Sequence, residues 1–226
     1  MWNILRRIMA APDLRNKVLF TLAMLLVFRV LAQIIVPLTP AELSRLHELF
    51  TNNSHQNLNQ LINLQDIFAG GSLRTFSIVA LGVYPYITAT IVMQLLTPII
   101  PALQNMQQTQ GEAGRLRFSQ ITRIVTVPLA FLQALAQSAI YVNARVLDPA
   151  TFNLFGPNWL ATLAILVSLT TGTLILVWLG ELITEHGIGN GISLIIFAGI
   201  VSGMPSQVRQ WYLETIPKRG LPAVLS

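Results

Sequence analysis

Residues 186–201 of the chain read HGIGNGISLIIFAGIV. Glycines alternate with larger residues at its start, and a mostly apolar stretch follows. Small residues in a membrane helix let the backbones of neighbouring helices approach closely. We therefore predict a membrane helix over about 188–206, packed closely against a neighbour through the glycines of this region: Gly187, Gly189, Gly191, Gly199 and Gly203.

The composition of the whole chain agrees with a membrane protein. The 226 residues include no cysteine, 53% are hydrophobic and only 10% are charged, whereas soluble domains carry roughly 25% charged residues. This excludes an ordinary soluble domain, a disordered chain and a disulfide-stapled module. The lack of cysteine also excludes thiolate zinc sites and thiol nucleophiles.

Further apolar runs precede the first stretch. A bilayer core of about 30 Å needs about 20 apolar residues in a helix. The runs predict an all-α, multi-pass membrane bundle with five helices, at about 18–37, 74–98, 119–142, 158–180 and 188–206. Pro85 falls inside the second run and predicts a kink there. Residues 221–226 resemble the start of another apolar segment, so we expect the chain to be incomplete.

Basic residues at the flanks predict the orientation, because Lys and Arg are enriched in cytoplasmic loops. They precede the first run and surround the link between the second and third runs: Arg6, Arg7, Arg15 and Lys17, then Arg115, Arg117 and Arg123. We therefore expect the N-terminus and this link in the cytoplasm, although Arg209, Lys218 and Arg219 oppose the rule. The net charge of +5 is too dispersed for a nucleic-acid site.

Two segments are too short to span. Residues 1–12 suit an interfacial amphipathic helix ended by Pro12, or a frayed terminus. Within 58–71, apolar residues recur at helical spacing among Asn, Gln and Asp until Gly70 and Gly71 break the pattern. The apolar residues are Leu58, Leu61, Ile62, Leu64, Ile67 and Phe68.

Arg29 is a polar residue inside the first run, where a cation costs at least about 2.5 kcal/mol at the bilayer centre. It either pairs structurally with a helix-end carbonyl or an acid, or it has a functional role. Glu181, Glu185 and His186 invite a metal or general-base interpretation. We favour a solvated helix end over that interpretation, and we predict neither a catalytic residue nor a metal site.

Apolar residues four positions apart share a helix face, as Val83 and Ile87 do in one run and Ile192 and Ile196 in another. Taken alone, this spacing favours packing or lipid contact over a pore.

Several strings together resemble the SecY family of protein-translocation channel subunits. They are KVLFT (17–21), VFRV (27–30), FAGGS (68–72), FSIVALGVYPYITA (76–89), GEAGR (111–115), QITR (120–123), WLGELITE (178–185) and the first stretch, 186–201. The resemblance covers nearly the whole chain but only the first half of the family, whose members have ten membrane helices in two inverted halves.

The resemblance implies a bacterial cytoplasmic-membrane channel, with no cofactor, that threads unfolded polypeptide across the bilayer and releases hydrophobic segments into lipid. It places Val83, Ile87, Ile192 and Ile196 in a pore ring, residues 58–71 in a plug and Gly70 and Gly71 at the plug hinge. It implies cytoplasmic positions for Arg115, Arg117, Arg123, Glu181 and Glu185. The implied partners are SecE and SecG, signal peptides, nascent chains and lipid, with SecA and the ribosome binding mostly through the missing half.

Two other classes compete with a channel. A small secondary transporter or half-transporter also uses glycine- and proline-interrupted helices, but it needs a site at the membrane midplane. We find no acid within the apolar runs to form one. A membrane-embedded hydrolase using Glu181, Glu185 and His186 would require loss of activity on His186→Ala.

Overall fold

The structure is a computed structural model that describes residues 12–51, 66, 69–108, 111–149, 152, 156 and 158–204. Its helices are α2 (Pro12–Leu31), α3 (Pro40–Thr51), α5 (Tyr84–Leu96), α6 (Pro101–Gln108), α7 (Gly111–Asn143) and α8 (Trp159–His186). A further helix, Gly191–Met204, follows α8. Within the described ranges the only β pairing is an isolated bridge between Ile35 and Ser77. The all-α prediction is confirmed.

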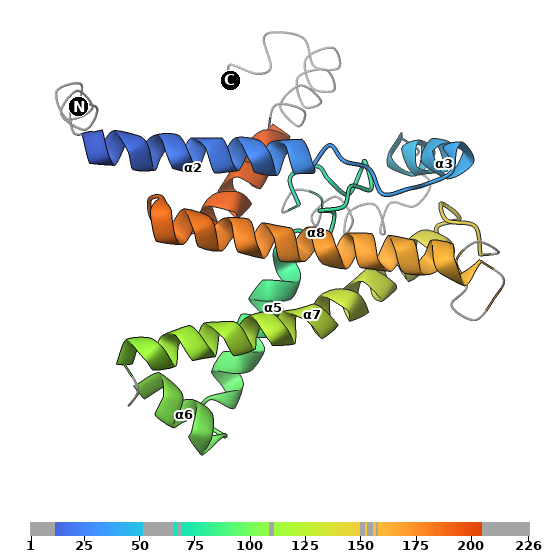
Figure 1. Cartoon of the computed structure of the whole chain (residues 1–226). Helices are drawn as coiled ribbons and strands as arrows, with labels where there is room; N and C mark the ends of the chain where they lie inside the picture. Colours follow the sequence, from blue (N-terminus) through green and yellow to red (C-terminus); the bar gives the residue numbers. More distant parts are fainter. Residues whose placement is uncertain are drawn as a thin grey trace, which may run out of the picture.

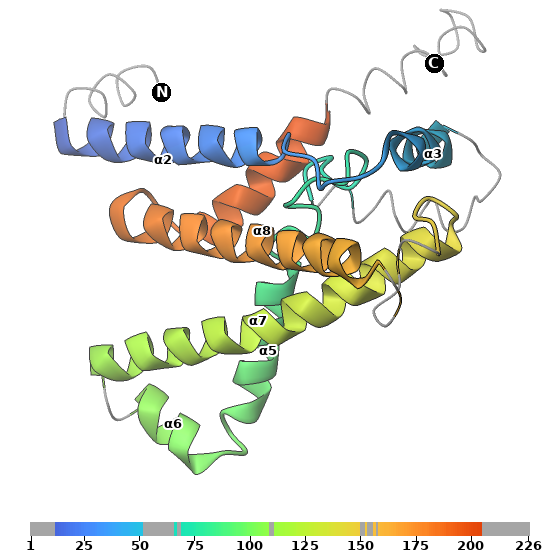
Figure 2. The ribbon, with the colours of Figure 1, turned by 45° about the vertical axis from the view of Figure 1, so that its right-hand side comes forward.

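Helix α8 lies at the centre of the molecule. It contacts α2, α5 and α7, and it runs beside α2 in the opposite direction in both views (Figures 1 and 2). Leu166, Leu176 and Ile183 on this helix are fully buried. Neighbours therefore surround α8 on several sides, which explains why its sequence is apolar around most of the helix.

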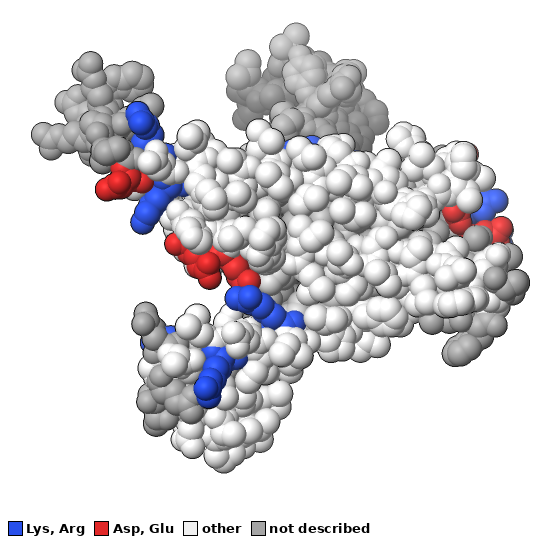
Figure 3. All heavy atoms as spheres, viewed as in Figure 1, with Lys and Arg blue, Asp and Glu red and all other residues white. Residues whose placement is uncertain are grey.

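Charged residues gather at the two ends of the molecule (Figure 3). The start of α2, the start of α7 and the end of α8 all lie toward the same end of the molecule (Figure 1). They carry Arg15 and Lys17, Arg115 and Arg117, and Glu181 and Glu185. The broad middle of this face shows almost only uncharged residues, as expected for a surface in contact with lipid.

Two described helical stretches are long and apolar enough to cross a bilayer alone, Ala113–Asn143 and Trp159–His186. The helix Tyr84–Leu96 and the following Pro101–Gln107 form a pair bent by 106°, which makes a third span if taken as one. The helix Gly191–Met204 is shorter, and α2 carries four charged residues, Asp13, Arg15, Lys17 and Arg29. The five-helix count therefore stays a prediction.

The second predicted helix, 74–98, begins later than expected, at Tyr84. The preceding residues form turns, with positive φ at Phe76 (46°) and Gly82 (59°), which no α-helix can contain. Pro85 therefore lies in the first turn of α5, where its missing N–H leaves no hydrogen bond unmade. The prediction that Pro85 kinks the helix is wrong.

The helix predicted over 18–37 lies closer to the N-terminus than expected, since α2 begins at Pro12 and ends at Leu31. The chain then extends and pairs with the loop before α5, since the Val36 amide donates to Phe76 and the Ile78 amide to Ile34. Pro12 is the first residue of α2, a position that proline's fixed φ favours.

The other boundaries differ at the charged end of the molecule. Helix α7 begins at Gly111 instead of 119, and α8 continues to His186 instead of 180. Polar and charged residues there extend both helices beyond the apolar runs, so hydropathy alone places the start of α7 too late and the end of α8 too early. The interfacial segment 1–11 and residues 205–226 lie outside the described residues.

Candidate functional site

The four predicted ring residues come together in one apolar cluster. Val83 is buried at the start of α5, and Ile87, Ile192 and Ile196 pack partly buried against the same cluster. The buried part of the cluster also includes Phe28 of α2 and Leu176, Leu179 and Ile183 of α8. Residues from opposite ends of the sequence therefore converge on the central helix.

This cluster borders a groove of about 510 Å³ between α5, α7, α8 and the helix Gly191–Met204. Ile87, Ile192 and Ile196 line one part of it, and Arg123 and Glu181 line another. The ring thus lies beside a hollow that has both apolar and charged walls.

The charged wall is held by an ion pair between Arg123 Nε of α7 and Glu181 Oε1 of α8. The prediction of a solvated helix end fits Glu185 and His186, which are exposed, but not Glu181, whose side chain is only 17% exposed. The His186 ring packs 5.9 Å from that of Phe20. Within the described residues, no three His, Asp or Glu side chains are placed to hold a metal ion.

The predicted hinge is a turn with left-handed backbone, φ +69° at Gly70 and +82° at Gly71. Asp66 closes it, since its carboxylate accepts the amide hydrogens of Leu73 (3.0 Å) and Arg74 (3.2 Å) and pairs with Arg74 Nε at 2.7 Å. Burial raises the pKa of Asp66, although the charge of Arg74 opposes the shift. The glycines and this carboxylate together define a compact turn.

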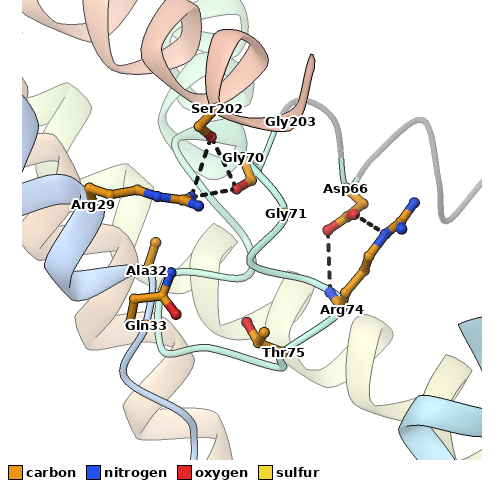
Figure 4. Close-up of a pocket in the computed structure, with 10 residues that line it drawn as sticks. All are labelled: Arg29, Ala32, Gln33, Asp66, Gly70, Gly71, Arg74, Thr75, Ser202 and Gly203. Carbon is orange, nitrogen blue, oxygen red and sulfur yellow. Dashed lines mark hydrogen bonds and ion pairs between the residues drawn. The ribbon is translucent and has the colours of Figure 1, made fainter. Parts of the chain in front are cut away.

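Arg29 reaches this turn from α2. Its Nη1 donates to the Gly70 carbonyl at 3.2 Å and to the Ser202 hydroxyl at 3.3 Å (Figure 4). Of the two interpretations open for Arg29, the structure shows pairing with a carbonyl, one that belongs to a turn and not to a helix end.

Of the glycines predicted to make close contacts, Gly191 and Gly199 do so, whereas Gly189 has open space around its Cβ position. A Cβ on Gly191 would lie 1.9 Å from the Gly180 carbonyl oxygen of α8, and one on Gly70 would lie 2.9 Å from the Gly199 Cα. Neither position has room for a side chain, so glycine is required at both.

The predicted residues divide into three groups. The ring residues are together, and Arg115 and Arg117 lie exposed at the start of α7. The apolar plug residues, Leu58, Leu61, Ile62, Leu64, Ile67 and Phe68, lie outside the described residues. The sequence analysis missed Ser202 and the Asp66–Arg74 pair, for which no local pattern exists.

The fold and the site define a multi-pass membrane protein with an apolar cluster beside a groove that has both apolar and charged walls. Residues 77–225 match the sequence profile of the SecY family. The protein translocase subunit SecY of Bacillus licheniformis is 40% identical over 225 residues, which are 97% of this chain and 48% of that protein. Its counterpart in Thermotoga maritima is 38% identical over 216 residues, 94% of this chain and 48% of that protein. The chain belongs to the SecY family.

Solved structures agree on the fold. One described as the structure of a protein conducting channel has a TM-score of 0.53 and 23% identity, and the match covers 83% of this chain and 36% of that one. Sec61 in the canine ribosome-channel complex from the endoplasmic reticulum gives a TM-score of 0.51, 21% identity and the same coverage. The chain spans about half the length of the curated relatives that it matches.

Proposed function

We propose that this chain is the first half of a channel subunit that passes unfolded polypeptides across the membrane and releases hydrophobic segments sideways into lipid. The observation that carries the proposal is the convergence of Val83, Ile87, Ile192 and Ile196 beside the groove. An apolar constriction expels water and so blocks ions, while a polypeptide can still pass between yielding side chains. Family membership favours this function over a secondary transporter.

In the same proposal, residues 58–71 form a plug that closes the resting channel and moves about Gly70 and Gly71. The left-handed backbone of both glycines supports a hinge, because few other residues adopt it. Deletion of the segment from the complete channel is expected to raise resting ion conductance. An unchanged conductance, with no neighbouring segment taking its place, would contradict the plug.

The proposed setting is the bacterial cytoplasmic membrane with the N-terminus in the cytoplasm. The proposed partners are SecE, SecG, SecA, the ribosome, signal peptides and nascent chains. Arg115, Arg117, Arg123, Glu181 and Glu185 would face the cytoplasm, and their position at one charged end supports this (Figure 3). We propose neither catalytic activity nor a cofactor.

Photocrosslinking of a stalled polypeptide tests the ring. The chain is completed by its second half and assembled with SecE, and a photoreactive residue replaces each ring residue in turn. All four positions are expected to capture the polypeptide. Leu166 of α8 is a control because it is fully buried in a different apolar cluster.

Equal capture at Leu166 and at the ring positions would return the four residues to ordinary packing. Transport of a small solute, with no capture of polypeptide at any ring position, would favour the transporter instead.

A further inference from the structure

Three segments far apart in the sequence meet at the Gly70 carbonyl. Arg29 Nη1 donates to this carbonyl from α2, and the Ser202 hydroxyl lies 3.3 Å from it on the helix Gly191–Met204. The single hydroxyl hydrogen of Ser202 is shared between this carbonyl and the nearer Gly199 carbonyl, at 2.8 Å, on the helix that touches Gly70 directly. Figure 4 shows Arg29 and Ser202 pointing toward the carbonyl from two sides.

These contacts differ in kind from those of Asp66. The bonds from Asp66 to Leu73 and Arg74 lie within the turn and move with it. The bond from Arg29 joins the turn to another helix, so it must break if the turn moves away. A charge-assisted hydrogen bond is roughly twice as strong as a neutral one, so Arg29 holds the Gly70 carbonyl more firmly than a neutral donor would.

Water can replace the Gly70 carbonyl when the bond breaks. Arg29 lines a pocket of about 290 Å³ together with polar side chains, among them Gln33, Thr75 and Arg74. A guanidinium beside a polar pocket can be hydrated there, which keeps the cost of releasing its partner low. The contact is therefore suited to repeated opening and closing.

We propose that Arg29 is a positioning residue that holds the Gly70 carbonyl against the helix Gly191–Met204 in the resting state and releases it when the turn moves. The inference rests on the proposed function, in which Gly70 and Gly71 are the plug hinge. It assigns to Arg29 control over how readily that hinge leaves its closed position.

The test measures exposure of the pocket. Thr75→Cys, which lines it, is introduced into the complete protein assembled in its membrane, and the rate of reaction with a water-soluble thiol reagent is recorded. Arg29→Gln is expected to raise the rate about tenfold, the effect of losing one charge-assisted hydrogen bond. Arg29→Lys keeps the charge on a shorter side chain and should give an intermediate rate.

Ser202→Ala provides a second variant, one that leaves the Arg29 charge in place. It should raise the rate less than Arg29→Gln does, and the double variant should react no faster than Arg29→Gln, because both side chains act on one carbonyl. Arg45→Gln, which removes an exposed charge from α3, is the matched control and should leave the rate unchanged. Resting ion conductance should follow the same order.

Three results would overturn the inference. The Arg29→Gln rate could equal that of the parent, Arg45→Gln could raise the rate as much, or the effects of Arg29→Gln and Ser202→Ala could be additive. If polypeptide is captured at the ring while these rates do not change, the role of Arg29 is wrong and the channel function stands. If the rates change as expected but the assembled protein carries no polypeptide, the role in holding the turn stands and the proposed function fails.

Discussion

Val83 and Ile192 are two of the four residues that form the proposed ring, one from each pair that shares a helix face. Val83 is only 5% exposed, and Ile192 packs against the same cluster. Changing both to serine places hydroxyl groups in the constriction, which favours water there. Resting ion conductance of the complete channel in planar bilayers is expected to rise several-fold.

Val167→Ser on α8 is the control for this change, because Val167 is exposed and lies outside both apolar clusters. Equal conductance in the ring variant and this control would show that the ring does not seal the channel.

Gly191 permits the tight crossing of the last helix over α8. Because a Cβ there would lie 1.9 Å from the Gly180 carbonyl oxygen, Gly191→Ala must push the backbones apart. Such overpacking costs about 1–3 kcal/mol. Thermal unfolding in detergent should show a lower Tm.

Gly189→Asn is the comparison variant. Gly189 has φ +72° and open space around its Cβ position, and asparagine tolerates this backbone conformation. A Tm as low for Gly189→Asn as for Gly191→Ala would mean that backbone conformation, and not the helix contact, limits stability.

Hydropathy predicted neither α3 nor α6, although the sequence contains the start signal of α3. Thr39, Pro40 and Glu42 match a capping box with proline at the first helical position. Glu42 Oε2 accepts hydrogen bonds from the Thr39 amide (2.9 Å) and hydroxyl (2.8 Å). Glu42 Oε1 also accepts the Asp148 amide hydrogen at 3.4 Å, which attaches α3 to the loop after α7.

Glu42→Ala removes the oxygens that accept these hydrogen bonds. We expect α3 to lose about 1 kcal/mol of local stability, the usual value of a helix cap, and hydrogen exchange of its amides to accelerate roughly fivefold. Ser44→Ala, an exposed change on the same helix, should have little effect. Exchange that is equally fast in both variants would argue against the cap as the source of stability.

The arrangement of charges over the whole molecule supports the predicted topology. If the charged end formed by α2, α7 and α8 is cytoplasmic, single cysteines at Gln110 and His186 should react only from the cytoplasmic side. Cysteines at Asn53 and Asn153 should react only from outside. The native chain has no cysteine, so no background reaction is expected.

Impermeant thiol reagents on intact cells and on inverted vesicles provide this measurement. Reaction of any of these four positions from the opposite side would refute the topology.

Local sequence was enough to recognise a helical membrane protein of this family. Each of the patterns that indicated this is short. The apolar runs, the faces that Val83 shares with Ile87 and Ile192 with Ile196, and the alternating glycines each depend on residues close together in the sequence. Patterns of this length predict helices and their faces, because helical periodicity and lipid contact act locally.

Only the tertiary structure decided which of these faces meet and where α5 begins. Hydropathy predicted a helix from 74, but the backbone of Phe76 and Gly82 is left-handed where the loop packs on α7, with the Phe76 ring 4.8 Å from that of Tyr141. The same holds for Arg29, whose partners Gly70 and Ser202 are distant in sequence. Contacts of this kind depend on how the helices cross. The energy of a hydrogen bond or an apolar contact depends on the distance between the groups in space, and local sequence does not specify that distance.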